Sequence, residues 1–338
     1  MNVKKLNETA KEMVANCKGI LAIDESHGTC KKRFESLNIP VNEENRRSYR
    51  DMLITAESLS NFISGAILFD ETIKQKTSDN ISFPEHMKKI GIIPGIKVDA
   101  GAKNFSCHPN EKITEGLDGL AERMLKYKEL GARFAKWRAV ITIDNSIPSD
   151  ACIIANAHAL ARYASICQEA DIVPIVEPEV LMDGNHDILK CFDVTNKTQS
   201  IVFETLDKLD VNFSGIILKP NMITSGSNCE DQASTEQIAE LTIKCLANNV
   251  PKDVPGIAFL SGGQSDENAS NNLNSINMIN NNPWKVTFSY GRALQLEAMK
   301  KWSGNNNNNL EAQKIIAKRA YLNSLAACGK YSLELENS

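Results

Sequence analysis

The chain has 338 residues, of which 42% are hydrophobic and 24% charged, a composition that supports a sizeable globular core. Its formal net charge of -4 argues against a nucleic-acid or anionic-membrane partner, because both require a basic protein face. No N-terminal apolar segment resembles a signal peptide, and no run of about 18 apolar residues could span a membrane, so a cytoplasmic location is expected.

Nine cysteines are distributed along the chain without a C-x-x-C motif. An odd number with unpatterned spacing favours reduced thiols in a reducing compartment over a disulfide framework. The five histidines are also scattered, with no pair four residues apart on a helical pattern, so no zinc site is predicted.

Short apolar runs recur along the chain and predict eight buried β-strands. They cover residues 19–24, 65–69, 95–98, 134–140, 172–177, 215–219, 256–260 and 285–289. Amphipathic segments lie between most of them, and Ser234 with Gln237 predicts a capping box at the start of one helix. Strands that alternate with helices pair in parallel, and eight such units close into a barrel. We therefore expect a single (β/α)8 TIM barrel over residues 1–338, with extra N-terminal and C-terminal helices and a short tail at 329–338.

Charged side chains stand at or near the ends of several predicted strands. In a barrel of this kind the carboxyl ends of the strands face the active site. One such charge is more often a solvated residue on the rim, but a group of both signs at one mouth favours a catalytic centre. The group consists of Asp24, Lys97, Lys136, Arg138, Glu177, Glu179 and Lys219.

The stretch GIILKPNMI places Lys219 at the last position of an apolar strand, directly before a proline that ends it. Burial and the other cations nearby should both lower a lysine pKa at this mouth. A neutral amine is what Schiff-base formation with a carbonyl substrate requires. The structural alternative is a lysine whose ammonium group extends to water.

Two glycine-containing loops follow the last two predicted strands. SGGQS begins at Ser261, and SYGR ends at Arg292, where a helical pattern starts. Glycines beside a helix start expose backbone N–H groups to an anion, and the corresponding loops of such barrels frequently bind phosphate. We favour a phosphate site over a plain turn because an arginine accompanies the glycines.

Nine segments of this sequence resemble the class I, Schiff-base-forming fructose-1,6-bisphosphate aldolases. They occur in the family's order, from the first predicted strand to the helix after the last. The segments are LAIDESHGTCKKRFE, EENRRSYRDML, GAILFDETIKQK, GIKVDAG, AKWRAV, PIVEPEVL, ILKPNMIT, FLSGGQSDENASNNLNSIN and TFSYGRALQ.

The resemblance implies reversible cleavage of fructose 1,6-bisphosphate into dihydroxyacetone phosphate and glyceraldehyde 3-phosphate, without a metal or another cofactor. It implies that Lys219 attacks the C2 ketone of the substrate. Glu177 would act as general acid and base on the carbinolamine, and Asp24 would take the proton of the C4 hydroxyl. Lys136 and Glu179 would hold charges and protons in place around them.

The resemblance also implies two phosphate sites in one cleft. At the ketose end it places Ser261, Gly262, Gly263, Gly291 and Arg292, with Ser289 as a further substrate-binding residue. Around the other phosphate it places Ser26, Thr29, Arg33, Lys97 and Arg138.

Two departures from the family pattern are visible. Ala100 in KVDAG replaces a residue that is often polar in the family, and the sequence KYSLELENS lacks the longer tail with a terminal tyrosine that many relatives have. Gly329 is expected to end the last helix, which tethers Tyr331 only two residues beyond it. We therefore expect proton transfer to the enamine intermediate without Tyr331.

Other functions stay open at this point. One is a related Schiff-base aldolase that acts on another phosphorylated sugar, such as sedoheptulose 1,7-bisphosphate. Another is a scaffold that uses the barrel to bind cytoskeletal or adaptor partners. The resemblance further implies a homotetramer.

Overall fold

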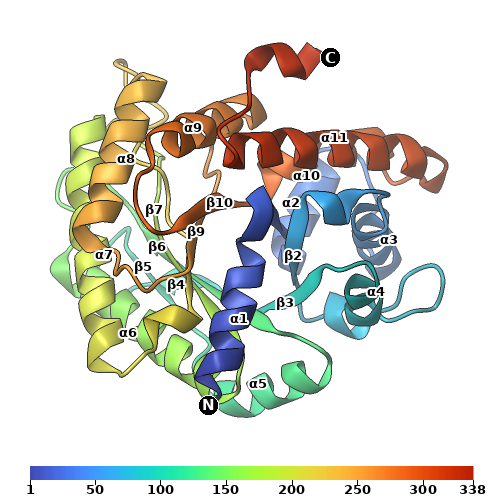
Figure 1. The fold of residues 1–338 in the computed structure, drawn as a ribbon, viewed down its shortest axis with the longest axis horizontal. Coiled ribbons are helices and arrows are strands. Elements are labelled where there is room, and N and C mark those ends of the chain that lie inside the picture. The colour runs from blue at the N-terminus through green and yellow to red at the C-terminus, as the bar shows by residue number, and fades with distance from the viewer. Residues whose placement is uncertain (338) are drawn as a thin grey trace.

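Eight parallel strands close into a barrel in the computed structural model, which describes residues 1–337 (Figure 1). Each barrel strand pairs with its neighbours along the chain, and the last strand pairs with the first. The predicted (β/α)8 barrel is thus confirmed. Its strands are β1 (Gly19–Ala22), β2 (Ile63–Leu68), β3 (Ile93–Lys97), β6 (Phe134–Ile141), β7 (Val173–Val180), β8 (Ile217–Leu218), β9 (Gly256–Phe259) and β10 (Lys285–Tyr290).

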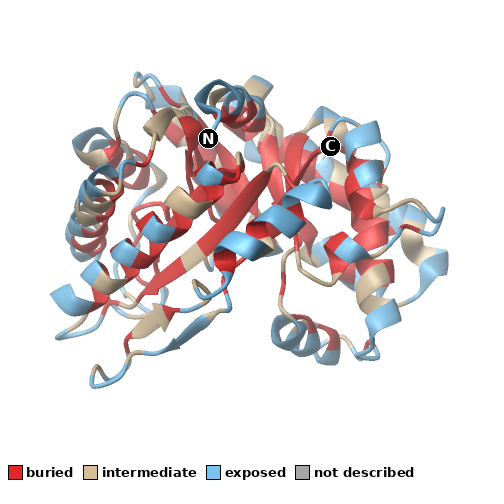
Figure 2. Ribbon diagram, turned by 90° about the horizontal axis from the view of Figure 1, so that it is seen from below, coloured by how far each residue is buried: buried red, intermediate tan, exposed pale blue. Residues whose placement is uncertain are grey.

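Helices surround the barrel and turn their buried faces toward it (Figure 2). The capping box predicted from Ser234 and Gln237 is present at the start of α8. The α-helices are α1 (Val3–Met13), α2 (His27–Glu35), α3 (Glu43–Ile54), α4 (Phe83–Lys89), α5 (Leu120–Glu129), α6 (Asp150–Glu169), α7 (Ile188–Lys208), α8 (Thr235–Asn249), α9 (Asp266–Ile279), α10 (Arg292–Trp302) and α11 (Asn309–Ala327). Short 3₁₀ segments lie at Ala15–Cys17, Leu59–Asn61, Thr72–Lys74, Phe213–Gly215, Asn306–Asn308 and Leu333–Asn337.

The extra N-terminal helix α1 closes the amino-terminal end of the barrel. Its apolar residues Leu6, Ala10 and Met13 pack in one buried cluster with Phe134 and other inward-facing strand residues. Glycine is required where the Phe134 ring crosses β3, because a Cβ on Gly95 would lie 2.2 Å from that ring. The interior is therefore filled from below, as in other barrels whose cores are packed rather than hollow.

A small antiparallel hairpin after β3 was not predicted. It pairs β4 (Ala102–Asn104) with β5 (Lys112–Thr114). The hydroxyl of Thr114 donates a hydrogen bond of 2.7 Å to the carbonyl of Arg138, which ties the hairpin to β6. Its strands are three residues long, too short for an alternating pattern to be recognised in the sequence.

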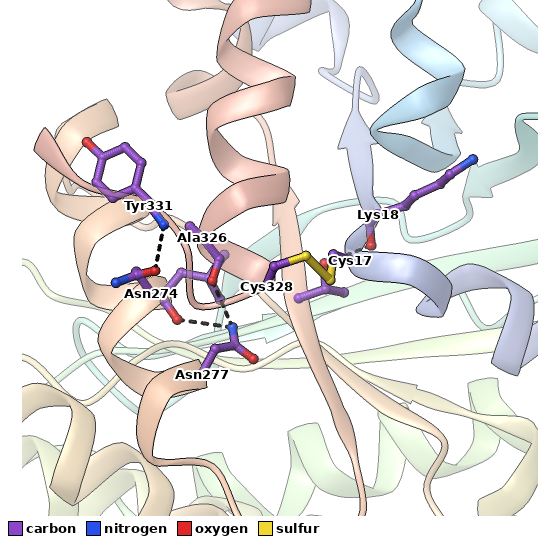
Figure 3. The surroundings of a disulfide bond; sticks show 9 residues. Cys17, Lys18, Asn274, Asn277, Ala326, Cys328 and Tyr331 are labelled. Carbon is purple, nitrogen blue, oxygen red and sulfur yellow. Dashed lines mark hydrogen bonds between the residues drawn. A yellow bond between two sulfur atoms is a disulfide. The ribbon is translucent and has the colours of Figure 1, made fainter. Parts of the chain in front are cut away.

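A disulfide joins Cys17 to Cys328, so the expectation that all nine cysteines are reduced is wrong (Figure 3). The two residues are 311 positions apart, and their Cα atoms lie 5.4 Å from each other. The fold brings the end of α11 beside the segment that leads into β1, a proximity that cysteine spacing cannot reveal. The disulfide also removes the argument for a reducing compartment that rested on the cysteines.

The segment after α11 packs back onto the molecule. Gly329 adopts a positive φ of 68° directly after the helix, as expected for a glycine that ends it. The backbone N–H of Tyr331 donates to Asn274 of α9 at 2.9 Å (Figure 3). The Tyr331 hydroxyl donates to Glu336 at 2.6 Å. Only 5% of Tyr331 is exposed. None of the helices described here is both long enough and apolar enough to cross a membrane.

Candidate active site

A cleft of about 660 Å³ opens at the carboxyl ends of the barrel strands. Every residue predicted for the site lines this cleft except Gly263. The lining members of that set are Asp24, Ser26, Thr29, Arg33, Lys97, Lys136, Arg138, Glu177, Glu179, Lys219, Ser261, Gly262, Ser289, Gly291 and Arg292. The barrel therefore brings together residues that span most of the chain.

Four charges, three of them buried and Asp24 partly buried, form a connected chain of ion pairs at the centre of the cleft. Glu177 lies between two lysines, with Oε1 3.0 Å from Lys219 Nζ and Oε2 3.3 Å from Lys136 Nζ. Lys136 Nζ also lies 2.7 Å from Asp24 Oδ2. Lys219 follows β8 directly, and its backbone N–H continues the pairing with β7 through the carbonyl of Val176 at 2.8 Å. The strand backbone thus fixes the point from which the Lys219 side chain extends into the cleft.

The ion pairs control the protonation of these groups. Burial by itself would raise the pKa of Asp24, but Lys136 and Lys219 outweigh it and lower that pKa to about 2. Burial opposes ionisation of Glu177 as well, yet the same two lysines and Arg138 lower its pKa. Both carboxylates are therefore ionised at neutral pH.

The expected fall of lysine pKa values is wrong for Lys136. Burial would lower the pKa of Lys136, but the carboxylates of Asp24 and Glu177 raise it above its ordinary value. The prediction counted the cations at the mouth and did not anticipate that carboxylates would lie between them. Lys136 is therefore a permanent cation of the site.

One side of the cleft is formed by the loops after β9 and β10. Ser265 caps α9 just beyond the SGG turn, and Arg292 is the first residue of α10. The guanidinium of Arg292 donates to the carbonyl of Gly262 at 2.8 Å, which links the two loops. Gly263 does not line the cleft, and its N–H donates to the Sδ of Met182 at 2.9 Å. The phosphate contact predicted for Gly263 therefore stays a prediction.

The other side carries the second predicted group of cations. The Nη1 atom of Arg33 lies 2.6 Å from Oε1 of Glu25, and Nζ of Lys97 lies 2.5 Å from Oδ1 of Asp99. The guanidinium of Arg138 pairs with Glu179. Each cation of this group is therefore held by a carboxylate.

Ser26 caps the N-terminus of α2 on the same side and lies 3.2 Å from the hydroxyl of Thr29. The two hydroxyls stand at the positive end of a helix dipole, an arrangement suited to an anion. They add hydrogen-bonding groups to the cations of this side.

Several lining residues were not predicted. Glu25 and Asp99 line the cleft and come directly after the predicted strands 19–24 and 95–98. Their position in the chain could therefore have predicted that they belong to the site. Phe69 and Lys103 also line the cleft. Lys103 lies on the hairpin that the sequence did not reveal. Ala100, the departure noted in the sequence, lines the cleft as well.

Comparison with known proteins agrees with the barrel fold. The family model "Fructose-bisphosphate aldolase class-I" matches residues 5–338. A probable fructose-bisphosphate aldolase class 1 from Xanthomonas campestris pv. campestris is 55% identical over 332 residues, which cover 98% of this chain and 99% of the relative. Fructose-bisphosphate aldolase 1 from Toxoplasma gondii is 50% identical over 330 residues, or 97% of this chain and 91% of the relative.

A solved structure shows the same fold. It is the fructose-bisphosphate aldolase from Plasmodium falciparum in complex with TRAP and a small-molecule inhibitor, and it superimposes with a TM-score of 0.96 at 49% sequence identity. The match covers 98% of this chain and 96% of that one. The chain therefore belongs to the class I fructose-bisphosphate aldolase family.

Proposed function

We propose that this enzyme cleaves fructose 1,6-bisphosphate reversibly into dihydroxyacetone phosphate and glyceraldehyde 3-phosphate through a Schiff base on Lys219. The observation that supports this most strongly is the buried chain of ion pairs from Asp24 through Lys136 and Glu177 to Lys219. It provides an amine, a carboxylate 3.0 Å from that amine, and a second carboxylate held ionised by a fixed cation.

The first half of the reaction forms the iminium. Lys219 transfers a proton to Glu177 and attacks the C2 carbonyl of the sugar with its free amine. Glu177 then protonates the hydroxyl of the carbinolamine, which leaves as water. The fixed positive charge of Lys136 stabilises the carboxylate of Glu177 when it is ionised again.

The second half breaks the carbon–carbon bond. Asp24 takes the proton of the C4 hydroxyl, the C3–C4 bond breaks, and its electron pair moves into the iminium to give an enamine. Glyceraldehyde 3-phosphate leaves first. Protonation of C3 and hydrolysis of the iminium then release dihydroxyacetone phosphate. The iminium is the electron sink, in keeping with the metal-independent chemistry of class I aldolases.

The two ends of the cleft would hold the two phosphates. Ser261, Gly262, Gly291 and Arg292 supply an arginine and backbone N–H groups near the start of α10, which suit the phosphate at the ketose end. Ser289 lines the cleft below them. The opposite side, with Ser26, Thr29, Arg33, Lys97 and Arg138, suits the other phosphate.

The direct test is a cleavage assay with fructose 1,6-bisphosphate and sedoheptulose 1,7-bisphosphate in the presence of EDTA. We expect the former to be cleaved with the higher kcat/KM and chelation to have no effect. Lys219→Met should lower kcat by roughly 10⁴-fold or more, because it removes the amine on which the proposed iminium forms. The control Lys252→Met removes an exposed lysine outside the cleft and should behave as wild type.

Preference for the seven-carbon sugar would support the alternative substrate. If neither sugar is cleaved, the result would favour the alternative hypothesis that the protein is a scaffold for partner proteins. Binding to adaptor proteins has one observation in its favour, because the Plasmodium falciparum relative was solved in complex with TRAP. A pull-down with the inactive Lys219→Met variant separates that role from catalysis.

The wider organisation belongs to the same proposal. Residues 1–338 would act as one barrel domain with a short tail at 329–338, in the cytoplasm and as a homotetramer. Light scattering during size-exclusion chromatography measures the last of these, with a mass of four chains expected and a single-chain mass as the contrary result.

A further inference from the structure

The charges that line the cleft are mostly paired with one another. Seven cations and five carboxylates line it. Five of those cations have a carboxylate within ion-pairing distance, namely Arg33, Lys97, Lys136, Arg138 and Lys219. An anion that approaches such a pair meets a cation whose field is largely cancelled by its partner.

Two lining cations are without a carboxylate partner in the described part of the chain, and they are Arg292 and Lys103. Among the described residues 1–337, the guanidinium of Arg292 hydrogen-bonds only to the carbonyl of Gly262. Lys103 has no hydrogen bond or ion pair from its side chain among residues 1–337. These two residues carry the net positive charge of the cleft.

The two unpaired cations lie on opposite sides of the mouth. Arg292 follows β10, next to β9, whereas Lys103 follows β3, next to β6. In the closed order of eight strands, the β9–β10 pair stands across the barrel from the β3–β6 pair. A ligand that spans the mouth between them would need an anionic group at each end.

The hairpin fixes the position of the Lys103 backbone. Asp99 accepts the N–H of Gly101 at 3.0 Å, and Lys103 pairs with Ile113 in the hairpin register. The backbone is thereby held, while the exposed four-carbon stem is free to move the ammonium group. Ala100 in the preceding turn brings no charge to this side, so Lys103 is the unpaired cation that the turn and hairpin supply to the cleft.

We propose that Lys103 binds the second phosphate of the substrate, opposite Arg292, and so makes the enzyme prefer a sugar bisphosphate to a monophosphate. This inference rests on the proposed function, because it assumes that a phosphorylated ketose spans the cleft. The paired cations Lys97 and Arg138 would orient that phosphate, and Lys103 would supply the charge that attracts it.

The test compares fructose 1,6-bisphosphate with fructose 1-phosphate, which lacks the second phosphate. Lys103→Met should lower the ratio of the two kcat/KM values about tenfold, the scale of one exposed charge-assisted contact. Lys103→Arg should restore most of the ratio. Lys112→Met is the matched control, because it removes a cation from the same hairpin. Lys112 donates to the side chain of Asn104 and does not line the cleft. It should leave the ratio unchanged.

An unchanged ratio in Lys103→Met would overturn the inference. An equal loss with both sugars would overturn it too, since that result means a damaged site rather than a lost phosphate contact. If Lys112→Met lowers the ratio as much as Lys103→Met, the hairpin fold and not the Lys103 charge is responsible. Failure of the proposed function looks different, because wild type itself would then cleave neither sugar.

Discussion

At the scale of single residues, Lys136 is the largest electrostatic contributor that keeps the carboxylates of Asp24 and Glu177 ionised. It lies 2.7 Å from Asp24 and 3.3 Å from Glu177, so one fixed cation serves both. In the proposed mechanism an ionised Asp24 would be the base for C4 deprotonation, and Glu177, shared between two lysines, would pass protons to and from Lys219. In that mechanism Lys136 would act on the reaction through these two neighbours, by holding positive charge beside them.

Tyr331 is the residue for which we predict no role in proton transfer. It is almost fully buried, its N–H and hydroxyl both have partners, and burial together with Glu336 raises its pKa. Tyr331→Phe should therefore change deuterium uptake into dihydroxyacetone phosphate by far less than the roughly 100-fold expected for a positioned general acid. Exchange slowed about 100-fold with normal bisphosphate cleavage would identify Tyr331 as the proton donor.

The strand-end charges were predictable because a barrel places them by topology. Asp24, Glu177 and Lys219 each stand at the end of an apolar run. The pattern of apolar runs and the position of each residue in the chain were therefore enough to predict that they lie at the barrel mouth. The balance between the charges was not predictable, because it depends on distances across strands such as that from Glu177 to Lys136. Recognition of the phosphate-binding residues also depended on the family resemblance.

At the scale of secondary structure, the loops after β9 and β10 and the helices that follow them form a candidate anion site. Arg292→Ala should weaken dihydroxyacetone phosphate binding by about 2 kcal/mol or more, because a charged hydrogen bond to phosphate is lost. Isothermal titration calorimetry measures this directly. Lys300→Ala removes an exposed cation from the same helix, paired with Glu297, and is the control that should bind normally. Unchanged affinity in Arg292→Ala would rule out this phosphate assignment.

The eight barrel strands were predictable as elements, since buried parallel strands are continuous apolar runs. Their ends moved by a few residues, as with β8, which is only Ile217–Leu218 although the apolar run covers 215–219. The hairpin β4–β5 was missed because pairing across a loop, not a pattern within either strand, defines it. Missing it also meant missing Lys103.

At the scale of the whole molecule, the disulfide joins the two ends of the chain. Closing a loop of 311 residues restricts the unfolded chain, so its loss should lower the free energy of unfolding by about 2–5 kcal/mol. Cys17→Ser, Cys328→Ser and the double variant should lose the same amount, measured by denaturant unfolding. Cys107→Ser removes an exposed free thiol and is the control. Losses that add in the double variant would mean that the cysteines stabilise the fold separately.

The disulfide is a feature that the sequence pattern could not predict. Its two cysteines are brought together by the closure of the barrel and by the packing of α11 on β1, so their proximity is a property of the complete fold. The number and spacing of cysteines pointed the other way. The (β/α)8 barrel, in contrast, was predictable from the sequence. Strands alternate with helices from residue 19 to residue 302, and no linker interrupts this alternation.

The most direct measurement is to trap the intermediate on the native enzyme. Borohydride added with dihydroxyacetone phosphate should reduce the iminium and attach the triose phosphate irreversibly, with complete loss of activity. Peptide mass spectrometry should then find the adduct on Lys219 alone, and EDTA should not affect its yield. An adduct on Lys136 or Lys97 instead, or no adduct in an enzyme that still cleaves the bisphosphate, would contradict the mechanism.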